Sequence, residues 1–375
     1  MSLTRFFTGH VGSSRIRSEH LRRPAMVTES SSVWVIPLLF AVCCQGFPQG
    51  HEGGLIRGLV RDSLSGQPLE HVNVFLASTT MGTGTRSNGS FALPKVPPGA
   101  YDLVLSCVGY ELKRLHVELT GPDTLSYEVR LRVRIIPVEG VEVAGNARQW
   151  KERLDHFLNV FLGDSRNAER CRLVNPEVLG FKADTALRML YATADRALIV
   201  ENRALGYRVR IELEQFQWNV EREYGTFVVY TRFDPLQGPN AAQRAQWQET
   251  REVTYRSSMR RFLAALVSGT LEEERFRLYA GSLEDLQVRL GKRLTPDQLA
   301  VEQVAGTPFF RWAHEGWLRV EQENPEGPAT SYIRLAEPVV FMSARGILRD
   351  PLSIGVLGYW KGCRIADLLP DDYVP

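Results

Sequence analysis

The stretch that decides the first fold is GLVRDSLSGQPLEHVNVFLASTTMGTGTRSNGSFALPKVPPGAYDLVLSCVGYE, residues 58–111. Within it Val72, Val74 and Leu76 are separated by single residues, and this period of two is typical of a β-strand with one buried face. Short strands at such close spacing predict an all-β sandwich over residues 54–134. The expected strands cover residues 55–62, 70–78, 83–87, 90–94, 101–108, 112–119 and 125–133.

Two turn signals lie between these strands. Asn88-Gly89 separates residues 83–87 from residues 90–94, and a type I′ turn needs a positive φ at both central residues, which Asn and Gly tolerate. Pro97-Pro98-Gly99 marks a second tight reversal. We therefore expect a β-hairpin with Asn88-Gly89 at its tip.

The same residues resemble the carboxypeptidase regulatory-like family, whose fold is a transthyretin-like (prealbumin-like) β-sandwich. The resemblance implies a fold and no reaction, because such domains accompany zinc carboxypeptidases, outer-membrane importers and many envelope proteins without being catalytic themselves. The matching elements are Gly58, Asp62, Gly66, Pro68-Leu69, Val72-Asn73-Val74, Gly82, Thr85-Arg86-Ser87-Asn88-Gly89, Phe91, Pro98-Gly99-Ala100-Tyr101 and Val108-Gly109-Tyr110.

Residues 1–46 are predicted to be a targeting segment. Arginines precede the uncharged apolar run VWVIPLLFAVCC (33–44), which has the length of a signal-peptide core and is shorter than the ~20 residues of a membrane-spanning helix. Gly46 is a plausible cleavage position, Met26 is an alternative start, and the bulky Val42 before Cys43 argues against lipidation. We expect an exported protein, periplasmic or associated with the outer membrane, and its mature chain has no integral membrane span. An uncleaved anchor is the alternative.

The composition bears on both the fold and the class of partner. Apolar residues make up 44% and charged residues 23% of the 375, which is enough apolar material for buried cores. The formal net charge of +2 gives no reason to expect nucleic acid as a partner.

The rest of the chain is predicted to be a connecting strand at residues 135–147 and an α+β domain with an antiparallel sheet at residues 148–375. A helix begins at Arg148, with an apolar stripe that runs from Trp150 to Phe161. We expect strands within residues 186–233 and helix over residues 241–268. Short helices are expected at residues 272–279 and 296–304, the latter with Thr295 as N-cap, and strands at residues 316–323, 330–337 and 338–345.

This second region is similar to an uncharacterised region that follows the regulatory-like module in a group of Bacteroidetes-type envelope proteins. That group has no assigned reaction. The segments that carry the similarity are residues 161–181, 198–216, 257–269 and 366–375.

No motif for catalysis, cofactor binding or metal binding is present. A zinc carboxypeptidase needs His-x-x-Glu, but no acidic residue stands three positions after any of the histidines outside the targeting segment. A serine nucleophile elbow, a phosphate-binding P-loop and a Cys-x-x-Cys pair are also missing. We therefore expect no catalytic residue, no cofactor and no metal. The histidines tested are His51, His71, His116, His156 and His314.

Three groups of residues keep more than one interpretation. Cys171 and His156 are a conceivable nucleophile and base, although core and surface roles are commoner. A polar cluster is a candidate for binding a cation or a sugar, or else caps local turns. A basic helix edge either faces an anionic partner or is solvated. The cluster is Asp155, Asp164, Asn167, Glu169 and Asn175, and the edge is Arg251, Arg256, Arg260 and Arg261.

The cysteines allow two states. Cys43 and Cys44 lie in the targeting segment, so Cys107, Cys171 and Cys363 remain. They form one disulfide and a free thiol, or three buried thiols.

The sequence as a whole favours a non-catalytic exported envelope protein with a binding or scaffold role, whose partner is an envelope protein or a glycan. The alternative is a hydrolase of peptide or glycan, with a site assembled from dispersed residues of 148–375.

Overall fold

The computed structural model describes residues 5–6, 53–134, 147–284, 287–324 and 327–375. The predicted targeting segment 1–46 and linker 135–147 therefore lie outside the described residues, apart from Arg5–Phe6 and Ala147. The two residues of β1 (Arg5–Phe6) pair with the edge of β14 (Tyr224–Pro235).

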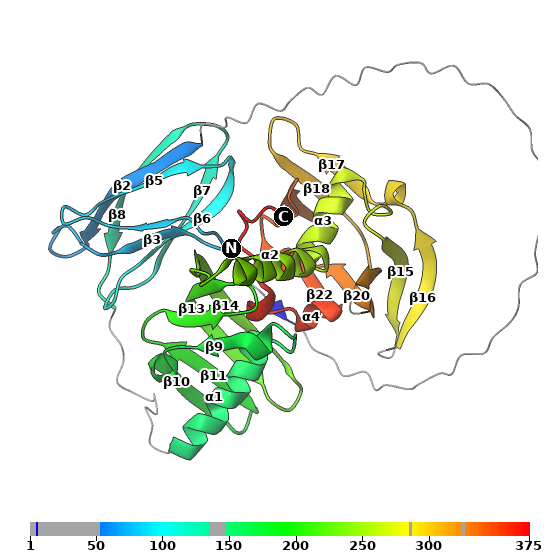
Figure 1. The fold of residues 1–375 in the computed structure, drawn as a ribbon, viewed down its shortest axis with the longest axis horizontal. Coiled ribbons are helices and arrows are strands. Elements are labelled where there is room, and N and C mark those ends of the chain that lie inside the picture. Colours follow the sequence, from blue (N-terminus) through cyan, green and yellow to red (C-terminus); the bar gives the residue numbers. More distant parts are fainter. Residues whose placement is uncertain (1–4, 7–52, 135–146, 285–286, 325–326) are drawn as a thin grey trace, which may run out of the picture.

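The first body is the expected β-sandwich, drawn in blue and cyan in Figure 1. One sheet has the order β5-β2-β8 and the other β4-β3-β6-β7. Between them Val72, Val74 and Leu76 are fully buried, as the alternation predicted. The strands are β2 (Gly54–Asp62), β3 (Asn73–Leu76), β4 (Gly82–Gly84), β5 (Ser90–Val96), β6 (Gly99–Ser106), β7 (Lys113–Leu119) and β8 (Thr124–Leu131).

The expected hairpin at Asn88-Gly89 is instead a corner between the two sheets. The turn is tight, since Gly89 N donates to Arg86 O at 2.8 Å and Gly89 has a φ of +76°. However, β4 pairs with β3 and β5 pairs with β2, so the strands on either side of the turn belong to different sheets. Gly89 is required here because a Cβ would lie 2.4 Å from Val60 O.

The second body is a single sheet packed on one helix, drawn in green in Figure 1. The stripe predicted from Trp150 to Phe161 lies on α1 (Ala147–Leu162) and packs into the core of this sheet. Trp150 Nε1 also donates to Leu179 O at 3.2 Å, which ties the helix to the sheet edge. Its remaining strands are β9 (Cys171–Leu173), β10 (Leu179–Asp184), β11 (Met189–Ala194), β12 (Leu198–Asn202) and β13 (Tyr207–Asn219).

The third body is a second β unit with its own core, drawn in yellow and orange. Its two antiparallel sheets have the orders β16-β15-β19-β20-β22 and β17-β18-β21, and the helix α3 (Met259–Ser268) packs into their core. The strands are β15 (Phe276–Glu284), β16 (Gln287–Leu294), β17 (Ala300–Gln303), β18 (Phe309–Ala313), β19 (Trp317–Asn324), β20 (Gly327–Leu335), β21 (Val339–Ser343) and β22 (Ile354–Gly358).

Two helices expected in this body are wrong. Residues 272–279 form a turn and the start of β15, because Phe276 and Leu278 are buried at every second position rather than at helical spacing. At residues 296–304 a single 3-10 turn (Pro296–Gln298) precedes β17. Thr295 does stand at its N-cap, and Gln298 Oε1 accepts from Thr295 N at 3.1 Å.

The helical region 241–268 is divided into α2 (Ala241–Arg256) and α3 (Met259–Ser268). With the sandwich and the antiparallel sheets, these helices confirm the expected mixed fold class. No helix among the described residues is long and apolar enough to cross a membrane.

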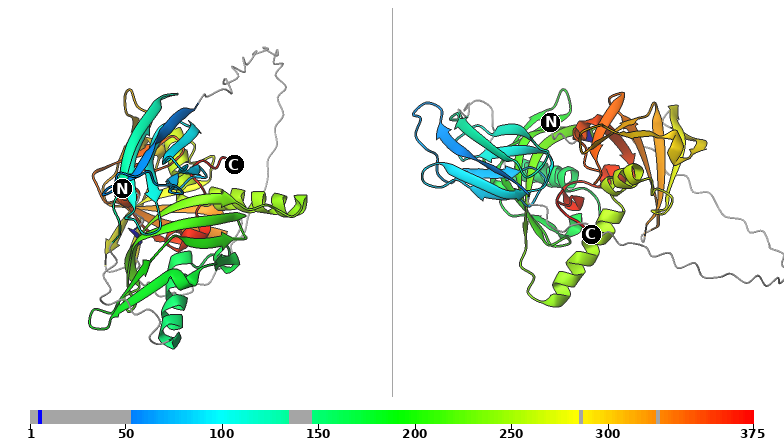
Figure 2. Two further views of the ribbon diagram at one scale, coloured as in Figure 1. Left: turned by 90° about the vertical axis from the view of Figure 1, so that its left-hand side faces the viewer. Right: turned by 90° about the horizontal axis from the view of Figure 1, so that it is seen from above.

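The sandwich is fastened to the second body by both hydrogen bonds and packing. Ser78 N donates to Thr231 O at 2.7 Å, and Phe233 N donates to Thr79 O at 3.0 Å, so the chain after β3 continues alongside β14. Phe75 and Val104, on the outer face of the sandwich, are buried with Val228 and Tyr230 of β14. The sandwich is therefore docked along a strand of the neighbouring sheet, as Figure 2 shows from two further sides.

Candidate functional site

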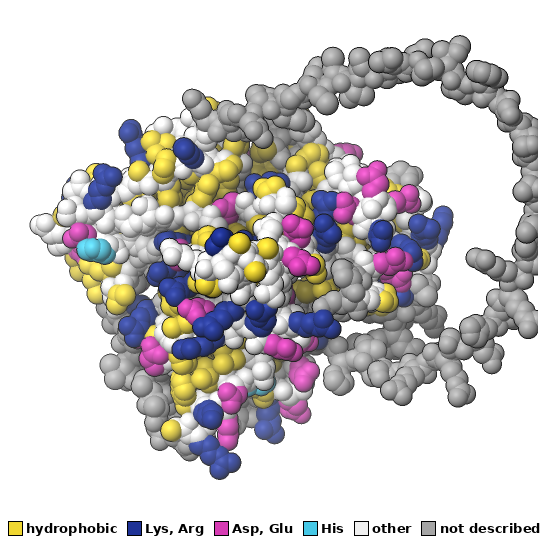
Figure 3. Space-filling view, in the orientation of Figure 1, with side chains coloured by type: hydrophobic (Ala, Val, Ile, Leu, Met, Phe, Trp, Pro, Cys, Tyr) yellow, Lys and Arg dark blue, Asp and Glu magenta, His cyan; other side chains and the backbone are white. Residues whose placement is uncertain are grey.

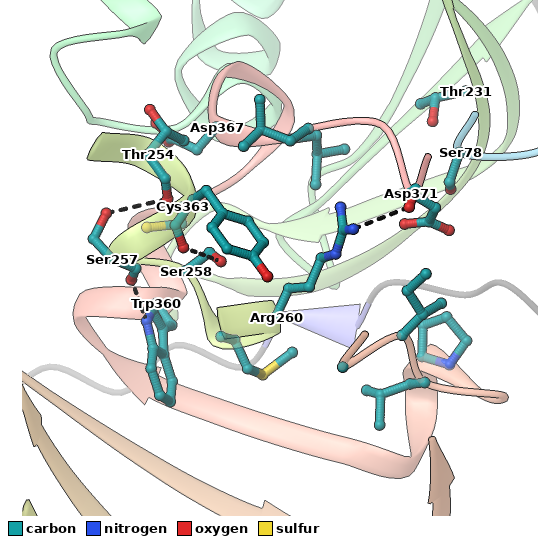
Figure 4. A pocket seen from close by; sticks show the side chains of 18 of the residues that line it. Ser78, Thr231, Thr254, Ser257, Ser258, Arg260, Trp360, Cys363, Asp367 and Asp371 are labelled. Atoms are coloured by element: carbon teal, nitrogen blue, oxygen red, sulfur yellow. Dashed lines mark hydrogen bonds between the residues drawn. The ribbon is translucent and has the colours of Figure 1, made fainter. Parts of the chain in front are cut away.

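The three bodies meet around a cavity of about 680 Å³. Its wall includes Ser78 and Tyr101 of the sandwich, Thr231 of β14, the α2–α3 junction and residues 346–371. Figure 4 shows polar side chains from these elements around a common space. The volume lies within the range usual for sites that bind small molecules.

The break between α2 and α3 places hydroxyl groups on this wall. Ser258 is the N-cap of α3, and its side chain accepts from Arg261 N at 3.1 Å, which allows the chain to leave the helical conformation between the two helices. Ser257 Oγ donates to Val253 O, while Ser257 O accepts from Trp360 Nε1 at 2.8 Å. Because Gly346 has no Cβ, its loop can lie directly against Arg260 O and close the other side of the cavity.

Asp367 is the acidic group at one end of the cavity. Its Oδ1 accepts from Ser165 Oγ at 2.9 Å and from Asn167 Nδ2 at 2.8 Å, and Asn167 Nδ2 also reaches Thr254 Oγ1 at 3.1 Å. Its Oδ2 is enclosed and accepts no hydrogen bond from the described residues. Burial raises the pKa of this carboxyl above its ordinary value.

Arg260 and Asp371 lie at another part of the cavity. Arg260 donates to the backbone carbonyls of Arg345, Pro370, Asp371 and Tyr373, so its guanidinium is committed to the protein itself. Burial raises the pKa of Asp371 to about 6, although Arg260 and Arg345 act in the opposite direction. Figure 4 shows Arg260 and Asp371 side by side, with Asp367 in another part of the view.

Aromatic side chains complete the wall. Tyr255 and Trp360 are nearly buried, whereas Tyr359 of the short helix α4 (Tyr359–Gly362) is 37% exposed. On the sandwich side Tyr101 Oη donates to Pro97 O at 3.0 Å, and burial raises the pKa of Tyr101 to about 12. The cavity thus combines aromatic faces with hydroxyl and amide groups and with charged side chains of both signs, among them the carboxyls of Asp367 and Asp371.

The structure does not support Cys171 and His156 as a nucleophile and base. Cys171 lies near Asp367, and burial raises its pKa to about 12, so the thiolate needed for attack is disfavoured. His156 is on α1 near Glu223, and burial lowers its pKa. No described hydrogen bond or ion pair joins the two side chains.

The predicted polar cluster is divided among separate places. Asn167 and Glu169 line the cavity, whereas Asp155 is exposed on α1. Asn175 has a local structural role, because its side chain donates to Ala197 O at 2.9 Å and accepts from Ile199 N at 2.8 Å. Among the residues that the structure describes, no three His, Cys, Asp or Glu side chains are grouped so that they could hold a metal ion.

The predicted basic edge is divided, since Arg251, Arg260 and Arg261 are bound within the protein whereas Arg256 is exposed to solvent. Arg251 donates to Leu205 O and lies 4.2 Å from the centroid of the Tyr207 ring. The partners of the others are Glu252 for Arg256, backbone carbonyls for Arg260 and Glu274 for Arg261. On the face shown in Figure 3, basic and acidic side chains are interspersed.

The three cysteines in the described part of the chain are free thiols, each partly buried. Burial raises the pKa of all three above the ordinary value.

Sequence reasoning missed Asp367, Asp371 and Trp360 as wall residues. They come from a segment that is far in sequence from Ser165, Thr254 and the sandwich, so no local spacing connects them. Of the cavity polar groups, Asn167 and Glu169 were the two singled out in advance as a possible sugar site.

Residues 56–143 match the family model of the CarboxypepD_reg-like domain. A search of the curated proteins finds no match to this chain. Several solved structures are similar at low TM-scores, which do not establish a shared overall fold.

A pilus 2b backbone protein of group B streptococcus has 16% identity and a TM-score of 0.19, and the match covers 22% of this chain and 41% of that one. A cohesin–X-dockerin complex from Acetivibrio cellulolyticus has 20% identity and a TM-score of 0.21, covering 30% and 76%. A putative carbohydrate binding protein from Bacteroides uniformis has 9% identity and a TM-score of 0.19, covering 78% and 100%.

Proposed function

We propose that this chain, whose residues 56–143 match the family model of the CarboxypepD_reg-like domain, is a non-catalytic binding protein of the cell envelope whose ligand occupies the cavity between the three bodies. The observation that carries the proposal is the cavity itself, at about 680 Å³, with walls from all three bodies. Docking of the sandwich along β14 gives that cavity a fixed shape, and a pre-formed site loses less entropy when it binds a ligand.

The groups on the wall favour binding over reaction. A nucleophile needs a base within hydrogen-bond reach, and burial raises the pKa of Cys363, the cysteine on the wall, rather than lowering it. Arg260 is occupied by backbone carbonyls and cannot also stabilise an anionic transition state without losing them. These contacts hold the wall in place.

The ligand class that fits the wall is a glycan fragment. Tyr255, Tyr359 and Trp360 offer aromatic surface, and hydroxyl, amide and carboxyl groups offer the mixed donors and acceptors that sugar hydroxyls need. Asp367 Oδ2, enclosed and without a donor among the described residues, would accept from such a hydroxyl. We therefore favour an envelope glycan over an envelope protein as the ligand of this cavity.

Export belongs to the same proposal. Its support is the arginine-rich start followed by the apolar run 33–44. N-terminal analysis of the protein from its native envelope is expected to find a chain that begins near residue 47. A chain that begins at Met1 or Met26 would contradict export with cleavage.

Binding is tested with purified oligosaccharides from envelope glycans in isothermal titration. The full chain is expected to bind one of them saturably, and Asp367→Asn is expected to weaken binding by roughly tenfold, as loss of one charged hydrogen-bond acceptor would. The matched control is Glu337→Gln, an exposed acidic residue that does not line the cavity. Equal weakening by both substitutions would contradict the location of the site.

One observation favours a second function. Asp367 and Asp371 both line the cavity, and burial raises the pKa of each. A glycoside hydrolase uses two carboxyl groups, one of them protonated. Release of shorter sugars during the titration, abolished by Asp371→Asn, would favour the hydrolase.

A further inference from the structure

Residues 366–375 cross all three bodies, and we refer to this segment as the strap. It begins within the 3-10 turn Ile365–Asp367, and residues 368–375 form no helix or strand. In Figure 1 this red segment lies at the centre, between the sandwich and the yellow strands. Its first residue is tied to the second body, since Asn202 Nδ2 donates to Ala366 O at 2.8 Å.

Backbone atoms of the strap are held by two arginines. Arg260 Nη1 donates to Pro370 O at 2.8 Å, and Arg260 Nη2 donates to Asp371 O at 3.0 Å and to Tyr373 O at 2.9 Å. Arg345 also donates to Asp371 O. These bonds hold the backbone of a turn, because Tyr373 N donates to Pro370 O at 2.9 Å, and they do not involve the side chains of residues 370–373.

The sandwich binds the strap from the other side. Asp371 N donates to Ser78 O at 2.6 Å, which extends the line of backbone bonds that joins Ser78 to β14. Thr80 N donates to Asp372 Oδ1 at 2.9 Å, and Thr80 Oγ1 donates to Asp372 Oδ2. Asp372 is thus the strap residue whose carboxylate the sandwich binds directly.

An aromatic side chain completes the contacts. Tyr373 is 8% exposed, and its ring packs edge-on against that of Tyr255, with centroids 6.1 Å apart. Its hydroxyl accepts from Gln248 Nε2 at 3.4 Å. The next residue, Val374, is 71% exposed, so the contacts end at Tyr373.

Backbone recognition, one carboxylate and one aromatic pocket are the components of a peptide-recognition groove. We propose that the groove between the sandwich and the α2–α3 helices is a peptide-binding site. The strap occupies it in this chain, and it also accepts, from another protein molecule, a segment with the pattern Pro-Asp-Asp-aromatic that forms the same turn. The strap has a single buried side-chain anchor beyond Pro370, and segments with few buried apolar contacts open at low free energy. An incoming peptide would make the same contacts and displace it.

The proposal is tested with a fluorescently labelled peptide of sequence LLPDDYVP, residues 368–375. The protein is the full chain with Asp372→Asn and Tyr373→Ala, which weakens its own strap but leaves the groove residues unchanged. Fluorescence anisotropy is expected to show saturable binding, with a Kd at least about tenfold lower for this variant than for the unaltered chain. A control peptide with Asn in place of the second Asp is expected to bind about tenfold more weakly.

Absence of saturable binding to the variant would overturn the proposal, as would equal binding of the two peptides. A second measurement does not depend on the variant. Hydrogen exchange of the unaltered full chain is compared with and without excess unlabelled peptide, and backbone amides of the strap are expected to exchange faster when the peptide is present. Unchanged exchange at the highest peptide concentration would also overturn it. Neither readout involves sugar, so the result is independent of the proposed glycan site.

Discussion

Arg260→Gln removes the side chain on which the position of residues 370–373 depends. Its guanidinium makes hydrogen bonds of 2.8, 3.0 and 2.9 Å to the carbonyls of Pro370, Asp371 and Tyr373, and a longer one of 3.3 Å to Arg345 O. A hydrogen bond to a charged group contributes about 1.5–3 kcal/mol. Three such bonds at the lower figure would amount to about 4.5 kcal/mol.

Two effects reduce that figure. The substitution removes the desolvation cost of a buried guanidinium. Burial lowers the pKa of Arg260, which shows that the charged side chain carries this cost in the folded protein. The released carbonyls also regain water when the strap lifts. We therefore expect Arg260→Gln to reduce the free energy of unfolding by about 2–4 kcal/mol.

Urea unfolding followed by tryptophan fluorescence measures this loss, and hydrogen exchange locates it. Amides of residues 76–81 and 369–374 are expected to exchange faster, because the strap bonds to the sandwich through Ser78 and Thr80. Arg256→Gln is the matched control. Its partner Glu252 is 3.7 Å away, and the Arg256 side chain is 69% exposed, so the expected loss is below about 0.5 kcal/mol. Equal effects of the two substitutions, or a loss below 0.5 kcal/mol for Arg260→Gln, would refute the reasoning.

Three further predictions concern other parts of the molecule. Because burial raises the pKa of Asp371 to about 6, the folded chain binds this proton more tightly than the unfolded chain, so stability from this group is full below pH 4 and is lost as pH rises through 6. Asp371→Asn is therefore expected to flatten the fall in unfolding free energy between pH 4 and 7, and an unchanged profile would contradict it. Gly89→Ala is expected to reduce the free energy of unfolding in urea by about 2–4 kcal/mol, and Gly66→Ala by about 1 kcal/mol. Both glycines have a positive φ, but only at Gly89 would the added Cβ lie against the backbone, 2.4 Å from Val60 O. Finally, metal analysis and a peptide-library assay are expected to find neither stoichiometric zinc nor peptide cleavage, and turnover lost on changing His156 or His314 to Ala would contradict this.

The sandwich was predictable from the sequence because its signals are local. Alternation at Val72, Val74 and Leu76 and the turn at Asn88-Gly89 depend on neighbouring residues only. What covers the outer face was not predictable. Phe75 and Val104 lie on the outer face of the sandwich, and they are buried because Val228 and Tyr230, far along the chain, pack against them.

The two wrong helices have a related cause. Residues 272–279 begin with three consecutive glutamates, which favour a helix, but Phe276 and Leu278 pair as part of β15 with β19 in the third body. Strand pairing of this kind depends on residues some forty positions away, so tertiary contacts override the local preference.

The candidate site was the least predictable part. The sequence predicts Asn167 and Glu169 as part of a polar cluster near a turn. The cavity, however, depends on Asp367, Trp360 and the strap, which lie far along the chain and pack against the other bodies. The sequence predicts Arg260 as part of a basic edge, and only the fold places its donors against the carbonyls of Pro370, Asp371 and Tyr373. No spacing within one segment encodes that contact.

The central claim is that the cavity between the three bodies binds a glycan without reacting with it. Isothermal titration of the full chain with the bound oligosaccharide, followed by mass analysis of the sugar recovered from the same cell, tests both halves together. We predict saturable binding at one site and recovery of the intact oligosaccharide. Failure of every envelope oligosaccharide to bind, or recovery of shortened sugar, would contradict the account.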